Sequence, residues 1–193
     1  MAIIGVILSI ALTSQNTFNK TLILKNAAYD VALTLRNAET YGLGSRAVGV
    51  IANAGYGIHF DKTQPGSFIL FADTSPAISS SCTKPGCLPG DHIFTLGADA
   101  RVQTYSLGNN ITVSDFCAYS TQFGGGWSCA AANGGTLSSL DVSFSRPNPT
   151  PFIQSGGFSY SAACISISSV QGGTKFISVA SSGQIAANAT SCP

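Results

Sequence analysis

The sequence predicts an α+β protein in which one long N-terminal α-helix packs on an antiparallel β-sheet globular domain with disulfide-closed loops. Three observations support this class. Apolar residues recur at helical spacing in the first 46 residues, alternating runs separated by turns follow, and six cysteines lie at or after Cys82. We therefore expect a helix over 1–46, with an apolar half at 1–23 and an amphipathic half at 24–42, and a β domain over 47–193.

The helix is predicted by an apolar stripe whose members are four, three, four and three residues apart. The stripe consists of Leu24, Ala28, Val31, Leu35 and Ala38. The same stepping continues backward to Ile3, so one helix can run from the apolar start to about Thr40. It is expected to end near 41–44, where glycine lets the chain leave the helical conformation.

The start of the chain is strongly apolar. Residues 1–19 carry no charge, and ten of the twelve residues from Met1 to Leu12 are apolar. This run is shorter than the roughly 20 residues that span a bilayer, and no basic residue precedes it as in a secretory signal. A weak signal peptide and the lower part of a longer apolar helix are the two interpretations. Because the helical stripe continues in register past the run, we favour the second.

The rest of the chain reads as strands and turns. Residues 56–60 and 67–72 flank a turn at 61–66, which predicts a β-hairpin. Further strands are expected at 92–96, 101–107, 137–144, 162–168 and 175–180. Residues 74–90 and 121–135 are turn-rich, so we interpret them as insertions closed by cysteines.

The composition excludes some partners. Only 9% of the residues are charged, against about 25% in an average soluble domain, so hydroxyls and amides must supply most of the polar surface. This is typical of extracellular proteins. The formal net charge is +1, which gives no global field to recruit nucleic acid or anionic lipid.

The cysteines are expected to form disulfides. They are Cys82, Cys87, Cys117, Cys129, Cys164 and Cys192. Zinc sites usually contain CxxC pairs or nearby histidines, and neither accompanies these cysteines. We expect neighbours along the chain to pair, because the first two flank a Pro-Gly turn and the next two flank a glycine run. The last pair then fastens the C-terminal segment.

The sequence points to no catalytic, cofactor-binding or metal site. The two histidines, His59 and His92, lie in no recognisable catalytic motif, and no GxSxG nucleophile elbow is present. The carboxylates are scattered singly, which supports neither a paired acid and base nor an EF-hand calcium loop. They include Asp61, Asp73, Asp91, Asp99, Asp115 and Asp141.

Several segments resemble one family. The apolar run from Ala2 to Ala11 is similar to the helix of type IV pilins and pseudopilins just after their processing site. The segments at 28–46, 56–60 and 68–73 resemble the GspH/FimT-like subgroup of pseudopilins and minor pilins, as does the ending from Asp141–Phe144 to Ser182–Ile185. The leader and processing site of that family are missing from this sequence.

The resemblance implies a bacterial structural subunit, not an enzyme, of a type IV pilus or a type II secretion pseudopilus. Its partners are expected to be other pilin or pseudopilin subunits, contacted through the N-terminal helix. The implied location is a single-pass inner-membrane protein before assembly and an extracellular or periplasmic filament afterwards. The residues expected to serve membrane insertion and helix packing are Ile3, Ile4, Gly5, Ile7, Leu8, Ser9, Ile10, Leu12 and Thr13.

Nucleic acid is not expected as a partner. Some FimT-like minor pilins bind DNA through a C-terminal segment containing arginine, but the corresponding residues 183–186 contain no basic side chain. Phosphate contacts need cations. We therefore expect weak DNA binding or none.

Two other functions compete with the filament subunit. A secreted, disulfide-rich adhesin or carbohydrate-binding module could use Trp127, Tyr119 and Phe123 together with the amide-rich loops. A secreted hydrolase is a more distant alternative, because nothing in the spacing selects a Ser/His/Asp set.

Overall fold

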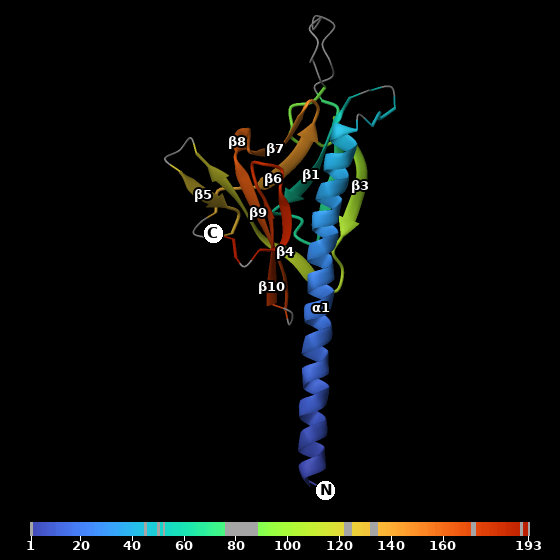
Figure 1. Ribbon diagram of the computed structural model, residues 1–193, viewed down its shortest axis with the longest axis vertical. Coiled ribbons are helices and arrows are strands. Elements are labelled where there is room, and N and C mark those ends of the chain that lie inside the picture. Colours follow the sequence, from blue (N-terminus) through green and yellow to red (C-terminus); the bar gives the residue numbers. More distant parts are fainter. Residues whose placement is uncertain are drawn as a thin grey trace, which may run out of the picture.

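The computed structural model describes residues 2–44, 46–49, 51, 53–75, 89–121, 125–131, 135–170, 173–189 and 191–192, with side chains from residue 19 onward except 188 and 189 (Figure 1). A long helix, α1, is followed by strands alone. The elements are α1(Ala2–Leu43), β1(Gly55–Asp61), β2(Ser67–Asp73), β3(Ala100–Ser106), β4(Ile111–Ser120), β5(Gly126–Cys129), β6(Ser139–Ser145), β7(Asn148–Ser155), β8(Phe158–Tyr160), β9(Ala162–Ser169), β10(Gly173–Val179) and β11(Ile185–Ala189).

The predicted extent of α1 is confirmed. Every member of the predicted stripe, from Leu24 to Ala38, is fully buried. At the C-terminal end the Gly44 N–H donates a hydrogen bond to the Thr40 carbonyl oxygen at 2.9 Å. Gly42 lies against the backbone of Phe144 in β6, and a Cβ there would collide with that carbonyl oxygen. Glycine in the last turn therefore lets the helix approach the strand closely.

The predicted fold class is wrong. In the described part of the chain the structure is mainly antiparallel β, with eleven strands in two sheets and α1 as the sole helix. A single sheet beneath the helix was expected. The physical reason is that five strands with weak sequence patterns, β4, β5, β7, β8 and β11, complete one sheet and build much of a second.

The two sheets enclose one core with α1. The first sheet has the order β3-β2-β1-β6-β7-β8 and the second the order β11-β10-β9-β4-β5. Ile58 and Phe144 from the first sheet share a hydrophobic cluster with Ile165 and Ile177 from the second and with Leu35 from α1. The alternate residues of β1, β2 and β6 lie on the opposite, outer face of the first sheet.

One predicted strand is a loop, and the predicted hairpin is confirmed. β1 and β2 pair antiparallel around the 61–66 turn. Residues 92–96 are not a strand, because His92 has a φ of 68° and the segment crosses the outer face of the first sheet. Its apolar side chains fill that face: the Phe94 ring contacts Phe71 at a centroid distance of 5.3 Å.

The expected single-pass location in the inner membrane is also wrong. Among the residues that the structure describes, no helix reaches the length and hydropathy that a membrane crossing demands. The apolar run at the start of α1, interrupted by Gly5 and Ser9, ends at Leu12, well short of the roughly 20 residues required.

Candidate functional site

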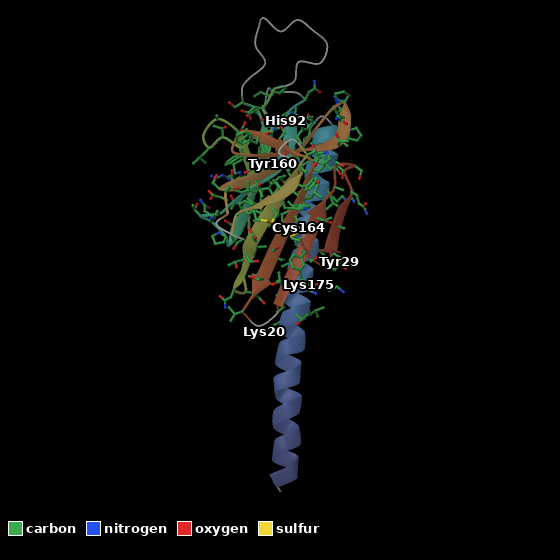
Figure 2. The ribbon with its side chains drawn as sticks, turned by 90° about the vertical axis from the view of Figure 1, so that its left-hand side faces the viewer. Lys20, Tyr29, His92, Tyr160, Cys164 and Lys175 are labelled. Carbon is green, nitrogen blue, oxygen red and sulfur yellow. A yellow bond between two sulfur atoms is a disulfide. The ribbon has the colours of Figure 1, made fainter. Side chains whose placement is uncertain are left out.

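The residues predicted for helix packing lie in the N-terminal half of α1. Figure 1 shows this half running well beyond the sheets, with no other described element beside it. The side chains of Ile3, Ile4, Gly5, Ile7, Leu8, Ser9, Ile10, Leu12 and Thr13 fall outside the described part of the structure. Figure 2 places Lys20, the first charged residue of the chain, where the strands begin.

Further along α1, an apolar stripe faces away from the core. It contains Leu22, Tyr29 and Leu33, which are seven and four residues apart and therefore share one face of the helix. Leu33 is the most exposed of the three at 60%. This exposed stripe, which we define as Leu22, Tyr29 and Leu33, is a face of α1 that no described strand covers.

Two grooves flank the exposed stripe, and Leu33 lines both. One groove, of about 390 Å³, lies between α1 and β11 and is lined by Ala32, Ile185 and Ala187 among others. The other, of about 310 Å³, lies toward Tyr105 and Leu107. Because apolar side chains dominate the first groove, the helix face and its border form a continuous surface suited to another apolar segment.

Two of the three expected disulfides are present. Cys117 in β4 is bonded to Cys129 in β5, its direct partner in the antiparallel register. Cys164 in β9 is bonded to Cys192 near the C-terminus. The expected pair of Cys82 and Cys87 lies outside the described residues. Stable disulfides are typical of proteins that fold in an oxidising compartment.

The C-terminal disulfide is expected to contribute substantially to stability. It closes a loop of 28 residues, and the entropy that the unfolded chain loses through such a loop corresponds to about 3.6 kcal/mol. A Cys164→Ser/Cys192→Ser double variant should therefore lose about that much free energy of unfolding, measured by urea denaturation. The Cys117–Cys129 disulfide closes a loop of only 12 residues, so the corresponding Cys117→Ser/Cys129→Ser variant should lose less. Equal losses, or none, would contradict the loop-closure explanation.

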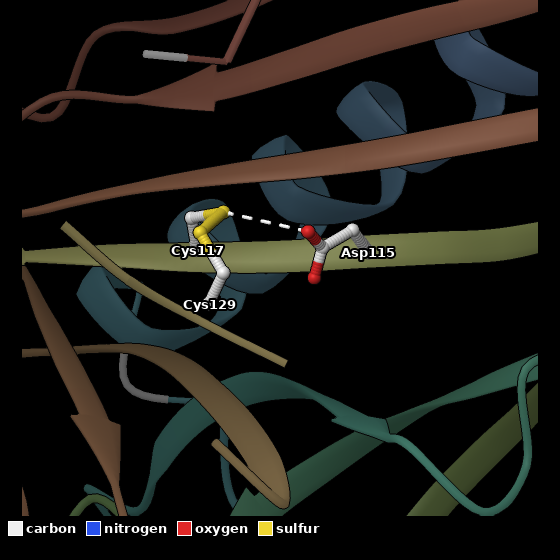
Figure 3. A group of neighbouring side chains, drawn as sticks. All are labelled: Asp115, Cys117 and Cys129. Carbon is white, nitrogen blue, oxygen red and sulfur yellow. Dashed lines mark hydrogen bonds between the residues drawn. A yellow bond between two sulfur atoms is a disulfide. The ribbon is translucent and has the colours of Figure 1, made fainter. Parts of the chain in front are cut away.

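Asp115 lies beside the Cys117–Cys129 disulfide, and the three residues superficially resemble a metal site (Figure 3). Both sulfurs are bonded to each other, so neither is a thiolate that could bind a cation. One sulfur lies 3.8 Å from Asp115 Oδ2, a contact without a donor hydrogen. Asp115 Oδ1 instead accepts the N–H groups of Ala130 and Ala131 at 3.0 and 2.8 Å. The carboxylate therefore holds the loop after β5.

Sequence reasoning missed a buried polar layer on the outer face of the first sheet. Asp73 accepts the N–H groups of Asp91 and His92 at 3.2 and 2.7 Å. Asp99 accepts those of Thr74, at 2.9 Å, and of two other residues. Both carboxylates are buried, so they tie the segment from Pro89 to Asp99 onto the sheet through backbone hydrogen bonds.

A histidine and a carboxylate from adjacent strands complete this layer. His59 in β1 lies directly opposite Asp141 in β6, and its Nδ1 is 2.8 Å from Asp141 Oδ1. Burial raises the pKa of Asp141, while the hydrogen bond from His59 lowers it. Asp141 Oδ2 is buried and has no hydrogen-bond partner among the residues that the structure describes. His59 is thus the main polar neighbour of a carboxylate that is otherwise poorly solvated.

The second histidine does not form a catalytic triad. His92 Nδ1 lies 3.3 Å from Ser143 Oγ and 3.6 Å from Asp73 Oδ2, and its ring stacks on Phe152 at 3.7 Å. In a Ser-His-Asp triad the serine and the aspartate contact different ring nitrogens. Here the same nitrogen faces both, and Ser143 is fully buried. The arrangement is a packed polar cluster.

The aromatic residues expected for a binding module are brought together in part. Tyr119 in β4 and Trp127 in β5 are cross-strand partners, with ring centroids 5.4 Å apart. Phe123 lies outside the described residues. The two rings support one another on the β4–β5 hairpin at the edge of the second sheet.

The alternating pattern of β6 offered the one signal that could have located the polar layer. Asp141 and Ser143 alternate with apolar Leu140, Val142 and Phe144, which indicates that both polar residues share one face.

No family model, curated protein or solved structure matches this chain.

Proposed function

We propose that this chain is a structural subunit of a type IV pilus or a type II secretion pseudopilus, and that it assembles with other pilin or pseudopilin subunits through α1. One observation carries the proposal. The helix continues far beyond the sheets (Figure 1), and its first 19 residues contain no charged side chain. An apolar helix that its own domain does not cover requires a partner surface.

Helices of other subunits supply the most suitable surface. Isolated helices are marginal in water, and packing of their apolar face provides most of their stability. Gly5, Ser9 and Thr13 are four residues apart, a spacing of small side chains that lets two helix backbones approach closely. The proposed contact therefore begins in the N-terminal half of α1.

The exposed stripe extends this contact onto the globular part. Leu22, Tyr29 and Leu33 offer apolar area next to the groove at β11. Each square ångström of apolar surface removed from water stabilises the assembly by about 25 cal/mol. A neighbouring helix that follows α1 along its length would cover both the uncharged half and the exposed stripe.

A charge placed in the exposed stripe should block assembly without unfolding the subunit. We expect Leu33→Asp to lower the amount of subunit in sheared surface filaments, relative to the whole-cell amount, by about tenfold or more, because an unpaired carboxylate would be buried between helices. Gly5→Leu should act in the same direction by keeping the backbones apart. Filament fractions would be compared by quantitative immunoblotting in the native host.

Phe158→Asp is the matched control. Phe158 is 56% exposed but lies in β8, on the sheet rather than on the helix, so its replacement should leave incorporation unchanged. If the wild-type subunit never enters a filament or pseudopilus complex, the proposal is wrong. A secreted binding module then becomes the better interpretation.

A further inference from the structure

A small cavity on the outer face of the first sheet has the features of a ligand site. It has a volume of about 150 Å³ and lies between the first three strands and the segment that crosses them. Its polar lining residues are His59, Asp61, Gln64, Ser67 and Arg101. Sites for drug-sized ligands begin at about 300 Å³, so this cavity suits a ligand with a single ring.

We propose that this cavity binds an acidic sugar, the uronic acid unit of an extracellular polysaccharide. Two sets of polar groups define the ligand. Arg101 is a cation suited to a carboxylate, whereas His59, Asp61, Gln64 and Ser67 are suited to hydroxyl groups. The proposal does not depend on the proposed assembly through α1, which uses a different face of the molecule.

The His59 ring is oriented so that it can accept a hydrogen bond from a ligand hydroxyl group. Its Nδ1 is 2.8 Å from Asp141 Oδ1, which fixes the ring. Nε2 has no hydrogen-bond partner among the described residues, and the His59 side chain lines the cavity and is 12% exposed. With Nδ1–H directed at the carboxylate, Nε2 is a hydrogen-bond acceptor for a ligand hydroxyl.

The charges in the cavity give the ligand one orientation. Asp61 would repel a carboxylate, so that group is directed toward Arg101, on the strand farther from Asp61. Asp61 Oδ1 already accepts the backbone N–H and the hydroxyl of Thr63 at 2.7 and 2.8 Å. Its second oxygen can accept a ligand hydroxyl. The Asp61 carboxylate would repel a simple dianion, whereas a sugar acid presents hydroxyl groups to it.

Apolar side chains on the crossing segment complete the site. The Phe94 ring lies against His59 at a centroid distance of 4.9 Å, and Leu96 is 74% exposed at the margin of the cavity. The carbon-bound hydrogens of a sugar ring form a weakly apolar face that packs on such groups. Leu96 would become covered when a ligand binds.

Isothermal titration calorimetry of the full chain with D-glucuronate tests the proposal. D-glucose and acetate serve as comparison ligands, because one lacks the carboxylate and the other lacks the hydroxyls. We expect saturable binding of D-glucuronate, at least about tenfold tighter than either comparison ligand. Arg101→Gln should remove the preference over D-glucose. Equal binding of D-glucose and D-glucuronate, equal binding of acetate, or no binding at all would overturn the proposal.

Two further variants keep the test specific. Replacing His59 would leave Asp141 without its partner and endanger the fold, so Gln64→Ala tests the hydroxyl end instead. It should weaken D-glucuronate binding several-fold. Lys175→Gln, which removes a cation from β10 in the other sheet, should change nothing. If Lys175→Gln and Arg101→Gln weaken binding equally, the attraction is a general charge effect and the assigned site is wrong.

Discussion

Replacing Leu35 by Asp is expected to unfold the protein. Leu35 is fully buried in the core that α1 shares with the two sheets. The substitution removes apolar contacts and places an unpaired carboxylate there, at a combined cost of well over about 3 kcal/mol. Because domains of this size are stable by about 5–15 kcal/mol, the variant should lose its cooperative thermal transition in circular dichroism.

Leu33→Asp is the control for this expectation. It introduces the same side chain two residues away on the same helix, at a position that is largely exposed. Surface substitutions of this kind usually change stability by less than about 0.5 kcal/mol. Similar melting curves for the two variants would show that Leu35 is not part of the core.

The second large effect concerns pH. Burial raises the pKa of Asp73 from 3.8 to about 7, against the lowering effect of its hydrogen bond from the His92 N–H; Asp99 and Asp91 raise it further by repulsion. Since the folded state holds this proton to higher pH than the unfolded state, the associated stability is present below pH 4. It is lost as the pH rises toward 7, by up to about 4 kcal/mol.

The Asp73→Asn variant isolates this contribution, because its amide resembles the neutral carboxyl group. We expect the stability of the variant relative to wild type to increase from pH 4 to pH 7.5, measured by urea unfolding at several pH values. Burial lowers the pKa of the neighbouring His92 from its ordinary value of 6.5. Lowering the pH below about 6.5 therefore reduces the free energy of unfolding through His92. This contribution is present in both proteins. Parallel pH profiles would mean that Asp73 titrates normally.

The helix could be predicted from sequence because its signal is local. Five apolar residues at helical spacing and a glycine-rich end define α1 from Leu24 to Leu43, and packing reinforces that pattern. The disulfide Cys117–Cys129 was predictable for a similar reason, since a turn between the two cysteines brings them together. In both cases nearby residues suffice to specify the structure. The disulfide Cys164–Cys192 was predicted only as the remaining pair.

The second sheet and the polar layer depend on distant residues. β7 contains Pro149 and Pro151, which normally argue against a strand, yet it pairs with β6 and β8. Asp73 and Asp141 appeared as isolated carboxylates, and only the pairing of strands brings their side chains onto one face. The apolar residues at 92–96 suggested a strand because a segment packed on a sheet also needs apolar side chains.

The pairing of His59 with Asp141 also constrains how β1 and β6 can align. A slip of β1 by one residue relative to β6 would turn His59 inward, against α1, and would turn Ile58 outward. An ionisable side chain would then enter an apolar interior without compensating water, and Asp141 would lose its partner, which makes the shifted alignment strongly unfavourable. The histidine and carboxylate therefore act as a register lock that selects one alignment of the central strands during folding and excludes the nearest competing one.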